Sequence, residues 1–260
     1  GILSEMKKFV LPNDYPDMSS SLMHIYLIEA GPRLLAGMSE ESSAHAEQFL
    51  REMGVNILLN KRVVDYRDHK VVLEDGTEIA TRTFIWVSGV TGVTIGNLDA
   101  SLIGRGGRIK VDSFNRVEGM NNVFAIGDQC IQLADENYPN GHPQLAQVAI
   151  QQGELLAKNL IRMEKGQEMK PFHYRNLGSM ATVGRNRAVA EFSKVKMQGW
   201  FAWVMWLVVH LRSILGVRNK VIVLLNWVWN YFTYDQSMRM IVYARKAKEI
   251  RDREKVEETT

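Results

Sequence analysis

The chain has 260 residues, of which 46% are hydrophobic and 23% are charged. This is enough for one large or two small domains and too apolar for disorder over most of the length. Its single cysteine, Cys130, excludes a disulfide framework and a dithiol redox pair within the chain. The net charge is only +3, but residues 185–255 hold fourteen Lys/Arg against five Asp/Glu, so this segment carries +9 and the rest of the chain −6.

The first predicted elements are a helix and a strand. Residues 1–9 have a helical pattern and no signal-peptide pattern, and Pro12 and Pro16 mark a loop after them. We therefore expect the chain to begin inside a structural unit. Leu22-Met-His-Ile-Tyr-Leu-Ile28 is a near-continuous apolar run, which is typical of a buried parallel strand, and it ends at Glu29.

A second helix and further strands follow. Residues 39–53 predict a helix with Ser39 as its N-cap and Gly54 as its stop signal. The strands expected after it are residues 55–59, the alternating region 62–80 around the hairpin signal Glu74-Asp75-Gly76-Thr77, and the buried strand 84–87 ending in Ser88-Gly89.

This strand–helix–strand pattern indicates a nucleotide-binding half-domain. Its opening strand and Gly-x-Gly-x-x-Gly turn would come before Gly1. In such folds an acid at the end of the second strand, about 20 residues after the glycines, bonds the ribose hydroxyls, and Glu29 sits at that point. A ribose contact and a merely solvated strand end remain the two interpretations of Glu29.

The segment that points most directly to a function begins with Asn122-Val-Phe-Ala-Ile-Gly-Asp128. We expect a short buried strand ending in Gly127-Asp128, and then a helix over residues 144–163. A carboxylate beside a helix N-terminus can accept hydrogen bonds from ribityl or ribose hydroxyls, while the helix offers free backbone N–H groups. This pairing predicts flavin chemistry. The alternative is an ordinary turn in which Asp128 caps the next element.

The same residues carry a resemblance to a known family. Gly127-Asp128, Ala146-Gln-Val-Ala-Ile-Gln-Gln-Gly153 and Gly178-Ser-Met-Ala-Thr-Val-Gly-Arg185 resemble type II NADH dehydrogenases, which are single-subunit, non-proton-pumping NADH:quinone oxidoreductases containing FAD. The likeness covers essentially the whole chain and corresponds to roughly the last three-fifths of a family member. It implies an α/β, Rossmann-like flavoprotein with two dinucleotide-binding domains, N-terminally truncated, and a C-terminal amphipathic membrane-anchoring helical tail.

The resemblance also implies roles for single residues. The implied FAD contacts are Gly127, Asp128, Leu145, Ala146 and Gln147, the implied NADH contacts are Glu29 and Gly89, and the implied quinone contacts are Gln147, Gln151, Asn186 and Val189. Gln147 and Gln151 are four residues apart and so project from one helix face, and they are the expected catalytic pair. Asn186 departs from the family, some members of which have Lys there. Both glycine turns, and a Glu that faces the flavin, would lie before Gly1, so we expect this segment alone to be inactive.

The resemblance also implies a division of the chain into domains. They are an NADH-binding domain over residues 1–96, the remainder of the FAD-binding domain over 97–170, short strands near the quinone site over 171–197, and a membrane-anchoring tail over 198–260. The six histidines have no metal-ligand spacing, so no metal site is expected. His142 lies closest to the predicted flavin residues.

The tail is apolar, rich in tryptophan and basic. Residues 200–209 form ten unbroken apolar positions and 221–232 a second stretch, each shorter than the 20 or so residues that span a bilayer. Five of the six tryptophans lie here, and such side chains settle at the headgroup level. We predict two short helices lying in an anionic membrane surface, with a solvated charged helix end after Arg245. Packing of the tail on the core or on a second subunit is the alternative.

The tail and the family resemblance together imply a peripheral membrane enzyme on the cytoplasmic face of the inner membrane. NADH would reduce FAD, and FAD would reduce a membrane quinone. The expected partners are lipid, quinone and a second copy in a homodimer, but not nucleic acid, because the basic segment is strongly apolar. A sulfide:quinone-type or ferredoxin-reductase-like relative is a second hypothesis, and the single cysteine disfavours the sulfide reaction. A membrane-docking or dimerisation module of another FAD-dependent pyridine-nucleotide oxidoreductase is the third.

Overall fold

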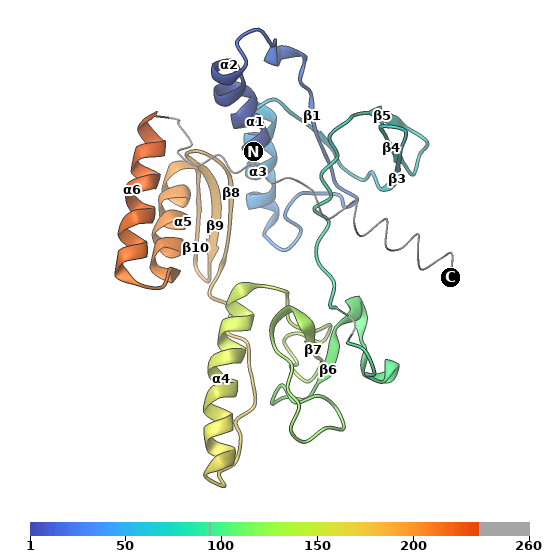
Figure 1. The fold of residues 1–260 in the computed structure, drawn as a ribbon, viewed down its shortest axis with the longest axis vertical. Helices are drawn as coiled ribbons and strands as arrows, with labels where there is room; N and C mark the ends of the chain where they lie inside the picture. The colour runs from blue at the N-terminus through green and yellow to red at the C-terminus, as the bar shows by residue number, and fades with distance from the viewer. Residues whose placement is uncertain (94, 234–260) are drawn as a thin grey trace, which may run out of the picture. The chain divides into compact units, whose positions relative to one another are not determined.

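The computed structural model describes residues 1–93 and 95–233 and has a mixed α/β fold (Figure 1). The chain divides into two compact units. Unit 1 comprises Gly1–Asn60, Met180–Ala190 and the chain from Lys196 onward, and unit 2 comprises Lys61–Ser179 and Glu191–Val195. Each unit is described by itself below.

Unit 1 is built on a short parallel pair of strands and the helix between them. Its elements up to Asn60 are α1 (Ile2–Glu5), η1 (Met6–Val10), α2 (Leu11–Asp14), η2 (Ser20–Leu22), β1 (Ile25–Ile28), α3 (Glu40–Glu52) and β2 (Val55–Leu58). β1 and β2 pair in parallel from Ile25↔Val55 to Ile28↔Leu58, which confirms the predicted strand–helix–strand order. The core between them consists of buried apolar side chains of β1, β2 and α3 with Val183 and Val189.

The ends of α3 follow local signals in the sequence. Ser39 is extended, and its hydroxyl accepts a hydrogen bond from the backbone N–H of Ser42, as an N-cap does. Glu40 and Glu41 lie in the first turn and Arg51 in the last, where their charges suit the helix dipole. Gly54 has φ +78, a left-handed conformation that favours glycine after a helix.

The N-terminal helical run is longer than predicted. It continues to Asp14, so the predicted loop at Pro12 is wrong. Pro12 occupies the first turn of α2, where a missing N–H costs least, and the wider π turn of η1 comes directly before it.

Unit 2 begins with a three-stranded antiparallel sheet. Its elements are β3 (Val63–Arg67), β4 (Lys70–Leu73), β5 (Glu78–Ala80), η3 (Ala100–Leu102), η4 (Arg105–Gly107), β6 (Ile109–Val111), η5 (Gly127–Gln129), β7 (Cys130–Gln132) and α4 (Ala146–Glu164). The predicted turn at residues 74–77 joins β4 to β5. A second turn, which the sequence analysis missed, joins β3 to β4 at Asp68 and His69, and both residues have positive φ, as a two-residue hairpin loop requires.

Two predicted strands of unit 2 are not strands. Residues 84–87 pair with no strand in the described part of the chain, and Ile85, Trp86 and Val87 are 55%, 61% and 77% exposed. An apolar run forms a buried strand only where a neighbouring strand accepts its hydrogen bonds, and none of the described strands does so here.

The second correction concerns residues 122–126. Instead of a buried strand, they form a single bridge, Arg116↔Phe124, flanked by hydrogen bonds from Val117 N to Val123 O and from Ala125 N to Asn115 O. The strand is β7, which pairs in parallel with β6 and begins after Gly127-Asp128. Asn115, whose φ is +62, lies in the turn that brings Val117 back beside Val111.

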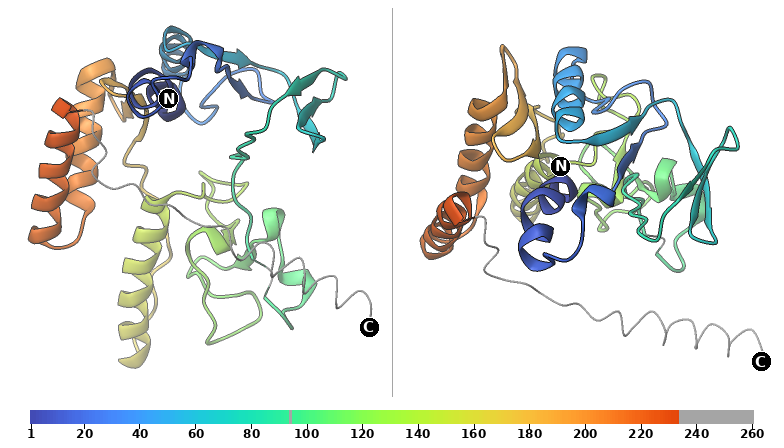
Figure 2. Two further views of the ribbon diagram at one scale, coloured as in Figure 1. Left: turned by 45° about the horizontal axis from the view of Figure 1, so that its top comes forward. Right: turned by 90° about the horizontal axis from the view of Figure 1, so that it is seen from above.

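The remaining elements are β8 (Ser179–Gly184), β9 (Arg187–Phe192), β10 (Val195–Gln198), α5 (Gly199–Ser213) and α6 (Val217–Thr233). The three strands form one sheet in the order β10-β9-β8. α5 and α6 lie side by side in all views, joined at Gly216 (Figures 1 and 2). This confirms two short helices in the predicted tail. Among the described residues no helix is long and apolar enough to cross a membrane. The rest of the predicted tail, residues 234–260 with the charged run after Arg245, lies outside the described residues.

Candidate functional site

Gly127 and Asp128 lie in η5, directly against α4. The Gly127 N–H donates to Oε1 of buried Gln152 at 2.7 Å, which ties the turn to the helix. Gly127 has φ +65, and a Cβ there would lie 3.2 Å from the Ala149 Cβ. Both observations explain why this position favours glycine: the backbone is left-handed and α4 passes close to it.

The N-terminus of α4 is open. Leu145 is its N-cap residue, and no side chain of the described residues caps the helix. Gln144 Nε2 donates to the Asp128 carbonyl at 3.2 Å, so the start of α4 is tied to the turn that carries the Asp128 carboxylate. Asp128, Leu145 and Ala146 are exposed. An exposed carboxylate beside uncapped helix N–H groups fits the ribityl and ring contacts of a flavin.

A buried polar network that the sequence analysis missed supports this end of α4. His142 Nε2 and Asp135 Oδ2 are 3.0 Å apart, and both side chains are almost completely buried. Arg108 donates from Nε to the Cys130 carbonyl at 2.6 Å and from Nη2 to the His142 carbonyl at 3.1 Å. The network therefore joins β6 and β7 to the loop that leads into α4.

The environment of this network shifts two pKa values. Burial alone would raise the pKa of Asp135, but the hydrogen bonds from His142 and from the backbone of Asn137 outweigh it and hold this pKa below its usual value. Burial lowers the pKa of Arg108, and the interactions with Cys130 and then Asp128 offset part of this effect.

Cys130 lies beneath the turn. Its side chain is 1% exposed, and burial raises the pKa of the thiol against the opposing effect of a hydrogen bond with Gln152. A buried protonated thiol is a poor nucleophile, so Cys130 is a packing residue of β7.

The side-chain amides of Gln147 and Gln151 hydrogen-bond to one segment of backbone. Gln147 accepts from Leu177 N at 3.1 Å and donates to Gly178 O at 3.0 Å. Gln151 accepts from Arg175 N at 3.1 Å and donates to Arg175 O at 2.9 Å. Each side-chain amide thus holds the backbone of residues 175–178 through one donor and one acceptor.

The other two predicted quinone residues, Asn186 and Val189, belong to unit 1. Val189 is fully buried in the core of that unit and exposes no surface. Asn186 has φ +62 in the turn between β8 and β9, and its Oδ1 is buried without a hydrogen-bond partner in the described part of the chain. Asn186 thus has unused hydrogen-bonding capacity, whereas Val189 serves as apolar support behind the turn.

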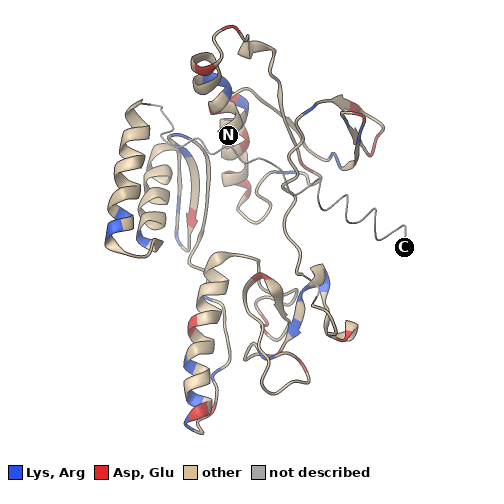
Figure 3. Cartoon of the chain, in the orientation of Figure 1, with Lys and Arg blue, Asp and Glu red and all other residues tan. Residues whose placement is uncertain are grey.

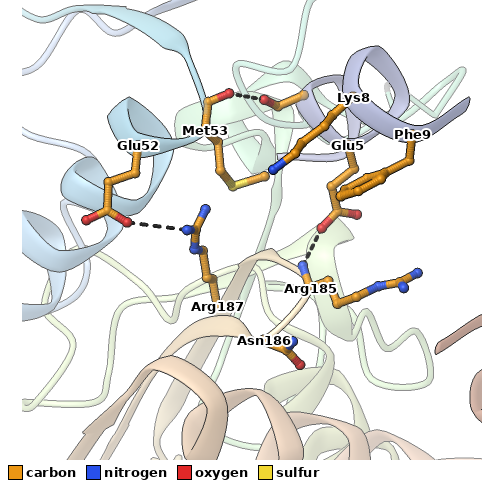
Figure 4. Close-up of a pocket in the computed structure, with 9 residues that line it drawn as sticks. Glu5, Lys8, Phe9, Glu52, Met53, Arg185, Asn186 and Arg187 are labelled. Atoms are coloured by element: carbon orange, nitrogen blue, oxygen red, sulfur yellow. Dashed lines mark hydrogen bonds and ion pairs between the residues drawn. The ribbon is translucent and has the colours of Figure 1, made fainter. Parts of the chain in front are cut away.

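The β8–β9 turn also lines a polar cavity of about 360 Å³ in unit 1 (Figure 4). Glu5 and Lys8 contribute from the N-terminal helical run, Glu52 from α3, and Arg187 from β9. The Glu52 and Arg187 side chains form an ion pair at 3.4 Å across one wall. Sequence analysis gave no sign of this cavity because its lining comes from three distant segments.

Arg185 joins this turn to α6. Its Nη1 donates to Tyr231 O at 3.1 Å and its Nη2 to Asn230 O at 3.0 Å, while its backbone N–H donates to the Glu5 carboxylate. The guanidinium also lies over the Tyr231 ring, 5.6 Å from its centroid. Arg185 therefore connects α6, the β8–β9 turn and the N-terminal helical run.

The two predicted NADH residues, Glu29 and Gly89, have different surroundings. Glu29 directly follows β1, and its Oε1 accepts from Gly31 N at 2.7 Å, which fixes the carboxylate at the strand end. That placement fits a ribose contact. Gly89 has φ +111 and lies in the exposed segment after residues 84–87, with no atom within 4 Å of its Cβ position. The space around the Cβ position of Gly89 is therefore open in the described part of the chain.

Comparison with known proteins gives the family. Residues 12–153 match the pyridine nucleotide-disulphide oxidoreductase model, and residues 176–234 match the NDH2 C-terminal domain. The chain is 33% identical over 240 residues to the type II NADH:quinone oxidoreductase NdhA of Mycobacterium tuberculosis, with 87% of this chain and 50% of that protein covered.

A second sequence relative and a solved structure show the same likeness. The mitochondrial internal alternative NAD(P)H-ubiquinone oxidoreductase A1 of Arabidopsis thaliana is 32% identical over 227 residues, covering 80% of this chain and 44% of that protein. The fold matches NDH2 from Plasmodium falciparum, solved in complex with NADH, with a TM-score of 0.80 at 18% identity, covering 91% of this chain and 63% of that one. The chain spans about half the length of the curated relatives it matches. It belongs to the type II NADH:quinone oxidoreductase family, within the pyridine nucleotide-disulphide oxidoreductases.

Proposed function

We propose that the chain is the C-terminal part of an enzyme that passes electrons from NADH through FAD to a membrane quinone without pumping protons. The observation that carries the proposal is the exposed Asp128 side chain on a turn whose backbone carbonyl accepts a hydrogen bond from Gln144, next to the uncapped N-terminus of α4. Membership of the family supports the same function, because relatives named for NADH:quinone or NAD(P)H-ubiquinone oxidoreduction match over most of this chain.

Gly127, Asp128 and the start of α4 would hold the flavin. Asp128 would accept hydrogen bonds from the ribityl hydroxyls, and Leu145, Ala146 and Gln147 would contact the ring, the last two through backbone N–H groups at the start of α4. When bound, FAD supplies the capacity to take two electrons from NADH and to deliver them to a quinone. The role of this chain is to orient the groups and to keep the Gly127 turn close to α4.

Glu29 would bond the adenosine ribose of NADH. A carboxylate at that position favours NADH over NADPH, because it repels the 2′-phosphate of the latter. The hydrogen bond from Gly31 N keeps the Glu29 carboxylate at the strand end and supports this assignment.

Gln147 and Gln151 of unit 2 would contribute to the quinone site, and α5 with α6 of unit 1 would bind lipid. Many large apolar residues of both helices are exposed, and cationic residues cluster where the helices meet (Figure 3). This arrangement supports a peripheral membrane enzyme, and we propose that the enzyme lies on the cytoplasmic face of the inner membrane. We propose that it acts there as a homodimer.

The test uses the full-length protein that contains this chain. We expect NADH to bleach the flavin absorbance of the wild type, and the reduced protein to reduce a quinone added in membranes. The affinity of Asp128→Ala for FAD should be lower by a factor of about ten or more, because a charge-assisted hydrogen bond contributes about 1.5–3 kcal/mol. Asp99→Ala, which removes only the cap of η3 in the same unit, is the control. A flavin-loaded wild type that NADH does not reduce would contradict the proposal.

A second candidate is a membrane-docking or dimerisation module in another FAD-dependent pyridine-nucleotide oxidoreductase. The exposed apolar surface of α5 and α6 is the observation in its favour. Under this reading Asp128→Ala would leave both flavin content and activity unchanged, while vesicle binding would persist.

A further inference from the structure

The contacts of Gln147 and Gln151 resemble strand pairing. A primary amide has the donor and acceptor of a peptide group in nearly the same geometry. One helical turn apart on α4, the two side chains meet the backbone of residues 175–178 through four hydrogen bonds of 2.9–3.1 Å. Residues 175–178 belong to no strand or helix, so these amides supply hydrogen bonds that a sheet would otherwise provide.

We propose that Gln147 and Gln151 are positioning residues. Their amides clamp residues 175–178 onto α4, and they act on the quinone through that segment. This inference rests on the proposed function. It changes the role of the two glutamines from direct quinone ligands to residues that hold one wall of the site.

The opposite side of the segment is also fixed. Gly178 has φ +108, and a Cβ there would lie 2.4 Å from Glu191 O and 2.9 Å from Phe192 Cδ1. The segment therefore lies between the amides of α4 and the end of β9. β8 begins at the next residue, Ser179, so the clamp sets the point from which that strand starts.

The segment held by the clamp presents an apolar side chain. Leu177 is 52% exposed although its own backbone N–H is bonded to Gln147. Because the clamp holds the backbone of Leu177 and Gly178, it fixes where this exposed apolar side chain lies. An apolar ring or isoprenoid chain is the kind of ligand that would cover it.

The clamp also limits what the amides can still do. Each amide has two N–H donors and two acceptor lone pairs, and the backbone uses one of each. The clamp thereby fixes which nitrogen and which oxygen face the segment. The remaining N–H of each amide therefore points in a set direction, away from the bonds to the segment.

The first experiment replaces the amide of Gln151 in the full-length enzyme, because Gln151 has no proposed flavin contact. Gln151→Met keeps the length and removes both hydrogen bonds. We expect hydrogen exchange of the Arg175 amide to become about tenfold faster. Loss of the two hydrogen bonds lowers the free energy of local opening, and the exchange rate rises accordingly. The quinone KM should rise while NADH-driven flavin bleaching keeps its rate. Gln48→Met on α3, which loses only a bond to the exposed Glu52, is the matched control.

The second experiment disturbs the segment and leaves both glutamines intact. Gly178→Ala forces the backbone away from Glu191, and its effect on the quinone KM should match that of Gln151→Met. Gly166→Ala is the control: it has φ +66, so it carries similar backbone strain, but no atom lies within 4 Å of its Cβ position.

The outcomes separate the alternatives. A raised quinone KM in Gln151→Met with unchanged exchange at Arg175, or a normal KM in Gly178→Ala with faster exchange, would overturn the clamp and leave the glutamines as direct ligands. If the wild type reduces no quinone with NADH, the proposed function fails and the quinone role of the clamp fails with it. The exchange data would then still report the contacts themselves.

Discussion

At the scale of single residues, the least replaceable group outside the proposed ligand contacts is the Asp135–His142 pair. His142 is enclosed by the rings of Tyr138, Phe172 and Tyr174, with centroids 5.2–5.9 Å away, and its Nδ1 has no partner in the described part of the chain. Asp135 is thus the hydrogen-bond partner of the His142 imidazole in the described part of the chain. Because His142 is two residues before Gln144, the pair fixes the loop from which α4 starts.

We predict that Asp135→Ala destabilises the protein by about 1–3 kcal/mol at pH 7, because it leaves a buried imidazole with both nitrogens unsatisfied. Chemical unfolding measures this. Glu136→Ala, at an exposed neighbour, should change stability by no more than about 0.5 kcal/mol. Equal effects of the two substitutions would show that the pair does not hold the loop.

The same substitution predicts a pH dependence. The pKa of Asp135 is lowered in the folded protein, so its ionised form stabilises the fold above the unfolded value of about 3.9, and this contribution is lost as the pH falls through the folded pKa. The stability difference between wild type and Asp135→Ala should therefore narrow below about pH 4. A difference that stays constant down to pH 2 would contradict the assignment.

At the scale of elements, Arg185 is one of the side chains that hold α6 within unit 1. Arg185 donates to two carbonyls of the last described turn of the helix and covers Tyr231, whose ring is 5.6 Å from that of Trp203 on α5. Positive charge near these carbonyls also suits the direction of the helix dipole.

We predict that Arg185→Gln lowers stability by about 1–3 kcal/mol, because it removes two charge-assisted hydrogen bonds and a ring contact. Tryptophan fluorescence of the Trp203 region should shift as α6 loosens. Arg187→Gln is the matched control two residues away, and because it breaks only a half-exposed ion pair, it should cost less than about 1 kcal/mol. Similar costs for the two variants would mean that Arg185 is not an attachment point.

The elements that could be predicted from sequence are those with local signals. Ser39 and Gly54 bound α3, and the apolar run before Glu29 contains β1. The strand predictions for residues 84–87 and 122–126 were wrong because an apolar pattern does not indicate where the partner strand lies. The positions of Gln147 and Gln151 on one helix face were predictable, but their partners were not, because those are backbone atoms about 25 to 30 residues away.

At the scale of the whole molecule, its most unusual feature is the amount of exposed apolar surface on α5 and α6. Leu225 is 63% exposed, Trp229 59% and Phe232 76%, although the two helices pack on each other through pairs such as Trp206–Trp227. Exposure on this scale is costly in water and marks a surface that something covers. The sequence composition predicted a lipid surface, and neither described helix is long enough to span one.

We therefore predict that the full-length protein binds vesicles containing an anionic phospholipid, and that Leu225→Asp with Trp229→Asp weakens this binding at least about tenfold. Each apolar side chain contributes about 1.5–3 kcal/mol when it leaves water, and each new carboxylate is repelled by the anionic surface. Co-sedimentation at low and high salt separates the two contributions, because only the charge-dependent part is screened. Val64→Asp, an equally exposed apolar position on β3, should leave binding unchanged. If the double variant still sediments with vesicles but no longer forms dimers, the covered face is a protein interface, and α5 with α6 joins two copies instead of meeting lipid.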